Sequence, residues 1–146
     1  MRAPWSPALL KPITERLFRS LPCSGPPPAD CAAALGLRWV TGRAGRQSES
    51  TEVAYHLKID VARAIVTEAR VQAFGCPHTL AAACLLAERL RDRPLVDLAL
   101  GAPQTWADEL GVPVEKLGRL LIVEDALEQG RLNGLELCRA QSLLRT

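Results

Sequence analysis

Two segments of alternating apolar and polar residues, joined by only three residues, constrain the fold of this chain more than any other feature. Thr51–Val61 and Ile65–Phe74 place apolar side chains at many of their alternate positions, which is the period of a β-strand with one buried face. The intervening Ala62–Ala64 is short enough to predict an antiparallel hairpin. Arg38–Thr41 has the residue types of a third strand, and we expect it to join the same small sheet.

The segments on either side of the hairpin have the apolar spacing and the proline and glycine boundaries of helices. A first helix ends at Ser20 and starts at Pro4 or, because a proline strains a helix interior, near Pro12. Everything from Pro77 onward is helical in pattern. The helices predicted there run over Pro77–Arg91, from Pro94, from Pro103 to Gly111, from Pro113 to Gly130, and from Asn133 to the C-terminus.

Two polar or proline-rich segments predict loops. Leu21–Asp30 contains four prolines and a glycine, and Gly42–Ser50 is polar with two glycines. The order of helix, antiparallel sheet and helices predicts an α+β fold, with about three strands and helices packed on one face of the sheet. We expect residues 1–146 to form a single domain with a proline-rich loop at 21–30.

Charge and composition exclude several functional classes. The chain has 18 Lys and Arg against 16 Asp and Glu, and this net charge of +2 gives no general attraction to nucleic acid or to a membrane surface. No apolar run approaches the roughly 20 residues of a membrane helix, and Met1–Pro12 does not resemble a signal peptide. The five cysteines are irregularly spaced, so we expect free thiols in a reducing compartment, the cytoplasm.

The segment with the clearest chemical potential is Phe74–Thr79, where a strand is predicted to end and a helix to begin at Pro77. Cys76 then occupies the N-cap position of that helix. Unpaired backbone N–H groups and the positive end of the helix dipole favour a thiolate over a thiol at this position. A thiolate binds soft metals, iron–sulfur clusters or a transferable sulfur atom, and His78 lies two residues further on.

A purely structural interpretation of these residues is also open, because a single cysteine at a turn is more often structural than functional. By the same reasoning, His78 alone is better explained as a solvated residue of the first helical turn. Cys84 and Cys138 fall within helical apolar patterns and are expected in the core. Cys23 and Cys31 lie in or beside the proline-rich loop, and whether they fold back towards Cys76 is open.

The segment Ile65–Cys76, which reads IVTEARVQAFGC, resembles the "I-x-D-A-R-F-x-x-x-G-C" segment of the IscU/NifU-type iron–sulfur cluster assembly scaffolds. The helix rich in small residues that follows is similar too, as is Val123–Leu127 (VEDAL) to the family's "A-E-D-A-I". The resemblance extends over roughly residues 51–131. It implies the α+β fold that the pattern of elements also predicts.

The resemblance further implies which site residues are retained. Family members hold a cluster or zinc with three cysteines and an aspartate, and only the second cysteine is matched here, by Cys76. The first loop has no cysteine or aspartate, and Glu49 and Glu52 are its nearest acidic residues. The family's "K-x-H-C" step is Lys116-Leu117-Gly118-Arg119, so Arg119 stands at the position of the third cysteine.

Three functions follow from this resemblance as hypotheses. The first is a scaffold-like protein that binds iron, zinc or a [2Fe–2S] cluster through Cys76 and His78, with Glu49, Glu52, Lys116 and Arg119 as auxiliary ligands or neighbours. The second is a metal-free interaction or regulatory module that docks on a cysteine desulfurase or another assembly protein. The third is a sulfur acceptor. A homodimer sharing a cluster between two copies of Cys76 stays open, and no enzymatic activity is expected because no nucleophile–base pair is visible.

Overall fold

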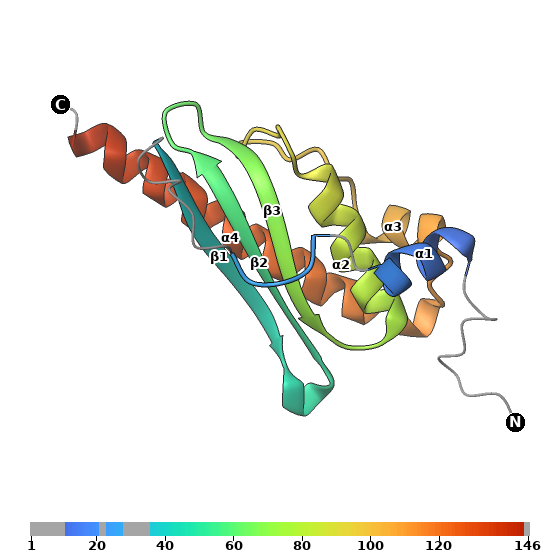
Figure 1. The fold of residues 1–146 in the computed structure, drawn as a ribbon. Coiled ribbons are helices and arrows are strands. Elements are labelled where there is room, and N and C mark those ends of the chain that lie inside the picture. The colour runs from blue at the N-terminus through green and yellow to red at the C-terminus, as the bar shows by residue number, and fades with distance from the viewer. Residues whose placement is uncertain (1–10, 21–22, 28–35, 145–146) are drawn as a thin grey trace, which may run out of the picture.

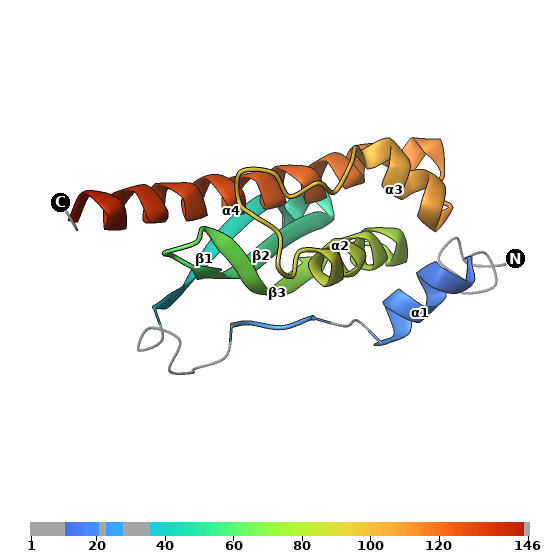
Figure 2. The same cartoon turned by 90° about the horizontal axis from the view of Figure 1, so that it is seen from above.

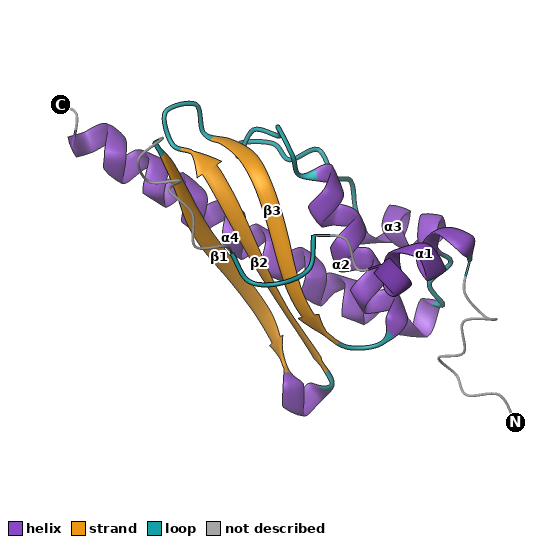
Figure 3. Cartoon of the chain, in the orientation of Figure 1, coloured by secondary structure: helices purple, strands orange, loops and turns teal. Residues whose placement is uncertain are grey.

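The structure is a computed structural model that describes residues 11–20, 23–27 and 36–144. It has the predicted α+β architecture, a three-stranded antiparallel sheet with helices packed against it (Figures 1 and 3). Its elements in chain order are α1 (Pro12–Ser20), β1 (Leu37–Arg46), the short 3₁₀ helix η3 (Gln47–Glu49), β2 (Thr51–Asp60), β3 (Ile65–Phe74), α2 (Pro77–Arg89), α3 (Pro103–Leu110), the 3₁₀ helix η4 (Val114–Lys116) and α4 (Leu117–Leu144).

The predicted hairpin is confirmed almost to the residue. β2 lies between β1 and β3 and pairs antiparallel with both, with a register shift in the β2–β3 pairing at Lys58/Ile59. The alternating apolar side chains of β2 form the centre of the core, and all are fully buried. These are Val53, Tyr55, Leu57 and Ile59.

Two helices cover this apolar face of the sheet. α4 packs along β1 and β2, and α2 packs against β3, so that the sheet lies to one side of both helices (Figure 2). The buried Tyr55 hydroxyl ties β2 to α2 by donating to the carbonyl of Ala83 at 2.7 Å. α1 lies on α2 rather than on the sheet, and Thr14 of α1 donates to the carbonyl of Leu110 in α3 at 2.6 Å.

The loop predicted over Gly42–Ser50 is wrong for its first half, because β1 continues to Arg46 before the 3₁₀ turn. The polar, glycine-bearing sequence suggested a flexible loop, but Gly42 serves close packing instead. A Cβ atom built on Gly42 would lie 2.1 Å from the backbone nitrogen of Gly130 in α4. Helix and strand can therefore approach each other this closely only because residue 42 is a glycine.

Three predicted helix boundaries are also wrong. Pro94 does not open a helix; it bridges to Ile65, and the next residue, Leu95, donates its N–H to the carbonyl of Ala64 at 2.9 Å. α4 does not end at Gly130, and Asn133 does not cap a new helix. The Asn133 side chain instead donates to the carbonyl of Thr41 in β1 at 2.7 Å, which fastens the middle of the long helix to the sheet.

The N-terminal part of the chain is described in pieces. The first helix begins at Pro12, the later of the two predicted starts, and the earlier start at Pro4 lies outside the described residues. Of the proline-rich loop, residues 23–27 are described. Ser24 forms a parallel bridge with Val71, so this segment lies along the outer edge of β3.

Candidate functional site

Cys76 occupies the position that the sequence predicted, the N-cap of α2 between the end of β3 and Pro77. Its backbone is extended, and its carbonyl accepts the first hydrogen bond of the helix from Leu80 at 3.1 Å. The half-buried sulfur lies 3.4 Å from the Thr79 hydroxyl. Gly75 permits this approach, because a Cβ atom built there would lie only 3.2 Å from the Thr79 side chain.

The surroundings of Cys76 favour its ionised form. Burial of the sulfur is the largest single influence and raises the pKa of Cys76. Hydrogen bonds from the His78 side chain, from the hydroxyl and N–H of Thr79, and from Arg119 act in the opposite direction. They outweigh burial and lower the pKa of Cys76 from 9.0 to about 5. Cys76 is therefore a thiolate at neutral pH.

His78 is buried, with 6% of its surface exposed, so the expectation of a solvated histidine in the first helical turn is wrong. Lys116 Nζ lies 3.3 Å from His78 Nδ1. A lysine ammonium can only donate, so Nδ1 accepts, and the proton of the neutral imidazole lies on Nε2. With its proton there, His78 acts at this site as a hydrogen-bond donor, and Lys116 fixes that state.

The structure thus brings together four of the six predicted site residues: Cys76 and His78 from the start of α2, Lys116 from η4 and Arg119 from α4. Glu49 and Glu52 are not part of this group. Glu49 is exposed in the 3₁₀ turn between β1 and β2. Glu52 lines a separate hollow of about 180 Å³ with Arg43 and Gln72 on the sheet.

A family model for the NifU-like N-terminal domain matches residues 32–133 of the chain. The match includes all three strands, α2, α3, the group around Cys76 and the first half of α4. The chain belongs to this family. A search of the curated proteins found no significant match.

Membership places the chain in iron–sulfur cluster assembly at the level of the family. NifU-like domains are in general scaffolds rather than enzymes, and they work with cysteine desulfurases and other assembly proteins. Among the described residues, no helix has the length and apolar character needed to cross a membrane.

The donor set around Cys76 does not fit a cluster or a zinc ion bound by this NifU-like chain alone. A [2Fe–2S] cluster and a structural zinc each need about four ligands. Cys76 offers one thiolate, and the Nδ1 atom of His78 already accepts from Lys116. Within the part of the chain that the structure describes, no group of three or more His, Cys, Asp or Glu side chains could hold a metal ion. Arg119 and Lys116 bring positive charge where a cation would bind.

The other described cysteines lie apart from this site and have different properties. Burial raises the pKa of Cys23 and of Cys138, and it raises the pKa of Cys84 in the core to about 12. Cys84 is 3% exposed, which confirms the predicted core position. Cys31 lies outside the described residues. Cys76 is the one cysteine among those described whose pKa is lowered.

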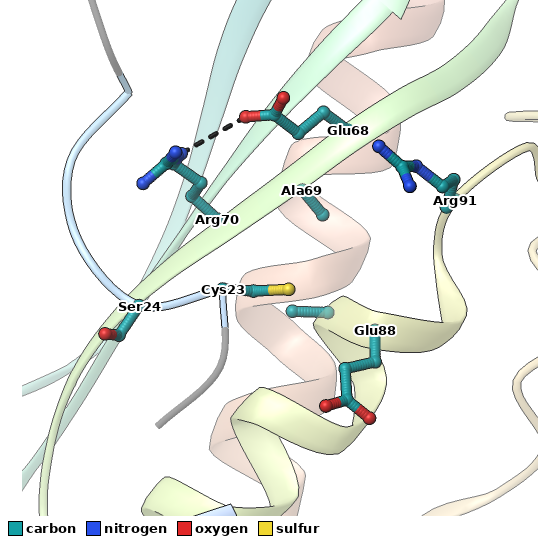
Figure 4. A pocket seen from close by; sticks show the side chains of 8 residues that line it. Cys23, Ser24, Glu68, Ala69, Arg70, Glu88 and Arg91 are labelled. Carbon is teal, nitrogen blue, oxygen red and sulfur yellow. Dashed lines mark hydrogen bonds and ion pairs between the residues drawn. The ribbon is translucent and has the colours of Figure 1, made fainter. Parts of the chain in front are cut away.

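Cys23 faces a cavity of about 490 Å³ between β3, α2 and the 23–27 segment (Figure 4). Four charged side chains line this cavity, but they interact mainly with protein groups: Glu68 pairs with Arg70 at 3.1 Å, and Glu88 pairs with Arg16 at 3.8 Å. The cavity does not include Cys76. Cys23 is therefore no additional ligand for the Cys76 site.

Thr79 is the one member of the site that the sequence reasoning missed. A signal for it was present, because the third residue after an N-cap is the position whose side chain reaches back to the cap in a capping box. Here the cap is a cysteine, and the hydroxyl of Thr79 reaches the sulfur. The spacing of Cys76 and Thr79 could have predicted the contact.

Proposed function

We propose that this NifU-like protein serves iron–sulfur cluster assembly as an interaction module that docks on a cysteine desulfurase or a related assembly protein and presents the Cys76 thiolate to it. One protomer on its own holds no cluster in this proposal. The observation that carries it is the pair of cations at the site: Arg119 helps to lower the pKa of Cys76, and Lys116 Nζ lies 3.3 Å from His78 Nδ1.

In this proposal, Arg119 and Lys116 supply the positive charge that a metal ion supplies in a scaffold with a complete ligand set. A thiolate in a partly buried position needs a positive or hydrogen-bonding partner, and metal is one such partner. Arg119 offers a permanent positive charge and fixed donors, because a guanidinium does not lose its proton in proteins. The site is thereby stable as a thiolate without metal, and a cation entering it would meet repulsion.

Exposed apolar side chains beside the site support a docking role. Phe74, two residues before Cys76, is 50% exposed, and Val114, two residues before Lys116, is 82% exposed. Large apolar side chains exposed next to a charged centre are typical of protein interaction surfaces. A partner that covers both would exclude water from Cys76.

In the complex, Cys76 has two uses that need no further residue of this chain. It can supply one ligand to a cluster whose other ligands are the partner's thiolates. It can also attack the outer sulfur of a persulfide on the partner's cysteine. The new S–S bond then forms on Cys76, the partner's S–S bond breaks, and its cysteine leaves as a thiolate.

A second candidate function is the binding of iron or a cluster through Cys76 and His78 with ligands from outside the chain. The low pKa of Cys76 favours it, because the thiolate is the form that binds metal. His78 would have to release Lys116 before Nδ1 could act as a ligand. Glu49 and Glu52 would contribute only after the hairpin between β1 and β2 moved.

Anaerobic reconstitution with iron and sulfide separates the two candidates. The protein, Cys76→Ser and Arg119→Cys would be compared by absorbance and by bound iron per chain. We expect wild type to bind no more iron than Cys76→Ser, and Arg119→Cys, which adds a second thiolate and removes a cation, to bind more than either. A wild-type cluster that is absent from Cys76→Ser would contradict the metal-free proposal in favour of the second candidate.

Co-purification with a cysteine desulfurase tests the docking itself. We expect a complex with wild type and a weaker one with Val114→Glu, which puts a charge on the exposed apolar surface beside Lys116. Gly118→Ala is the matched control, because it is a nearby exposed change with no neighbouring atom within 4 Å of the added Cβ. Failure of wild type to bind would refute the docking role.

A further inference from the structure

The outward face of α4 carries a continuous exposed stripe that the Cys76 site does not use. Its members are separated by steps of 4, 3, 4, 4, 3 and 4 residues, so they lie on one side of the helix. They span 22 steps, or about 33 Å at 1.5 Å per residue. They are Leu121, Asp125, Glu128, Leu132, Glu136, Arg139 and Leu143.

The stripe is exposed on α4, and Glu128 near its middle also borders the 96–101 segment in a hollow beside the helix. α4 forms an outer layer of the molecule, with the sheet on its other side (Figure 2). The face of α4 turned to the sheet carries the buried side chains and the glycines that approach the strands. The three leucines of the stripe are half of the large apolar side chains that are exposed among the described residues. Leu121 is 48% exposed, Leu132 48% and Leu143 68%.

The order of residues along the stripe is self-complementary about Leu132. When two copies of α4 lie antiparallel across a two-fold axis at this residue, Leu132 meets its own copy. Leu121 then lies opposite Leu143 of the second copy, and Asp125 lies opposite Arg139 of the second copy. Each of these two pairings occurs twice because a two-fold interface repeats every contact. Apolar residues thus meet apolar residues, and opposite charges meet.

One pairing in this arrangement brings like charges together, and the structure already compensates for it. Glu128 lies opposite Glu136 of the second copy. Glu128 pairs with Arg131 at 2.7 Å, and Glu136 pairs with Arg139 at 3.2 Å within its own chain. Each carboxylate therefore enters the interface with a guanidinium beside it.

We propose that the outward face of α4 is a dimerisation surface, and that its occupant is the antiparallel α4 of a second copy of this chain. The charge complementarity of Asp125 with Arg139, together with the matching positions of the leucines, selects this occupant over an unrelated helix. The step of 11 residues from each leucine to the next corresponds to 3.67 residues per turn, which keeps the leucines in line along a nearly straight helix.

The dimer has a consequence for the Cys76 sites. Arg119 lies 13 residues before the two-fold axis at Leu132, so the two copies of Arg119 are separated by about 39 Å along the helix axis. The two Cys76 thiolates then lie at opposite ends of the dimer. This dimer leaves each site open to its own partner, and it does not let two copies of Cys76 share one cluster. The surface is independent of the proposed docking role.

Charge reversal tests the pairing directly in the full chain. Sedimentation velocity or light scattering would follow wild type, Asp125→Arg and Arg139→Asp over a range of concentrations. We expect wild type to reach twice the 15.8 kDa of one chain as concentration rises, and each variant alone to stay monomeric because like charges then face each other. An equimolar mixture of the two variants restores both opposite-charge pairs, and we expect it to form a heterodimer.

Leu132→Glu places two carboxylates at the two-fold axis and is expected to abolish the dimer. Val114→Glu is its control, because it charges an exposed apolar residue that lies away from the stripe. Circular dichroism would verify that each variant is folded. A wild type that stays monomeric at every concentration, or a dimer that persists in Leu132→Glu, would overturn the proposal. So would two monomeric charge variants that fail to associate when mixed.

Discussion

Replacement of Arg119 by glutamine should raise the pKa of Cys76, and the structure sets the size of the change. Four hydrogen bonds, from His78, from Arg119 and two from Thr79, together lower this pKa from 9.0 to about 5 while also overcoming burial. Averaged over the four, this is about one pH unit or more each, and Arg119 is the smallest of them. Arg119→Gln keeps a side chain that can donate a hydrogen bond but removes the charge, so we expect the pKa of Cys76 to rise by roughly one unit.

Alkylation by iodoacetamide as a function of pH measures this pKa, because only the thiolate reacts. The extent of reaction at Cys76 would be read from the mass of its peptide, which separates it from the other cysteines. For wild type we expect the rate to reach half of its plateau near pH 5. For Arg119→Gln the midpoint should lie near pH 6, which makes the ionised fraction at pH 5 about five-fold lower.

The midpoint is the quantity to compare rather than the plateau rate, because a thiolate becomes more nucleophilic as its pKa rises. Arg119→Lys is the matched control: it keeps the positive charge, so its midpoint should stay closer to that of wild type. A midpoint that is the same in wild type and Arg119→Gln would refute the role assigned to this guanidinium. A wild-type midpoint near 9 would refute the thiolate itself.

Two further perturbations follow from the structure. The pKa of Cys76 is lower in the folded protein than in the unfolded chain. Ionisation of Cys76 therefore adds to the free energy of unfolding above pH 9, and this contribution is lost as the pH falls towards 5. In urea titrations, the difference in free energy of unfolding between wild type and Cys76→Ser should grow from pH 6 to pH 8. In the same urea titrations, Gly42→Ala should destabilise the fold by about 3 kcal/mol, because the added Cβ would meet the backbone of α4. Gly118→Ala, on an open helix surface, should stabilise the fold by about 0.5–1 kcal/mol.

The hairpin was predictable because its signal is local. Alternation over two strands and a short link between them require no knowledge of what packs on the sheet, and β2 and β3 have nearly the predicted bounds. Gly42 and Gly130 were not predicted correctly, because their signal is not local. Gly42 and Gly130 suggested a loop and a helix end, but each is a contact point between α4 and β1, and such a contact cannot be inferred from local sequence.

The helix starts predicted at Pro94 and Asn133 were wrong for the same reason. Both are typical residues of helix starts, yet the chain around Pro94 bonds to the edge of β3, and the Asn133 side chain bonds to β1. In each case a tertiary hydrogen bond determined the local structure. Within the site, the N-cap position of Cys76 was predictable from the strand, glycine and proline around it. The contact between Lys116 and His78 was not, because 38 residues separate them.

Ultraviolet titration of metal-free protein shows whether hydrogen bonds from the protein itself stabilise the Cys76 thiolate. The absorbance of wild type minus that of Cys76→Ser isolates the ionisation of this one sulfur. We predict a single step with its midpoint near pH 5. A step near pH 9, the usual value for a free thiol, would show that the protein does not stabilise the thiolate.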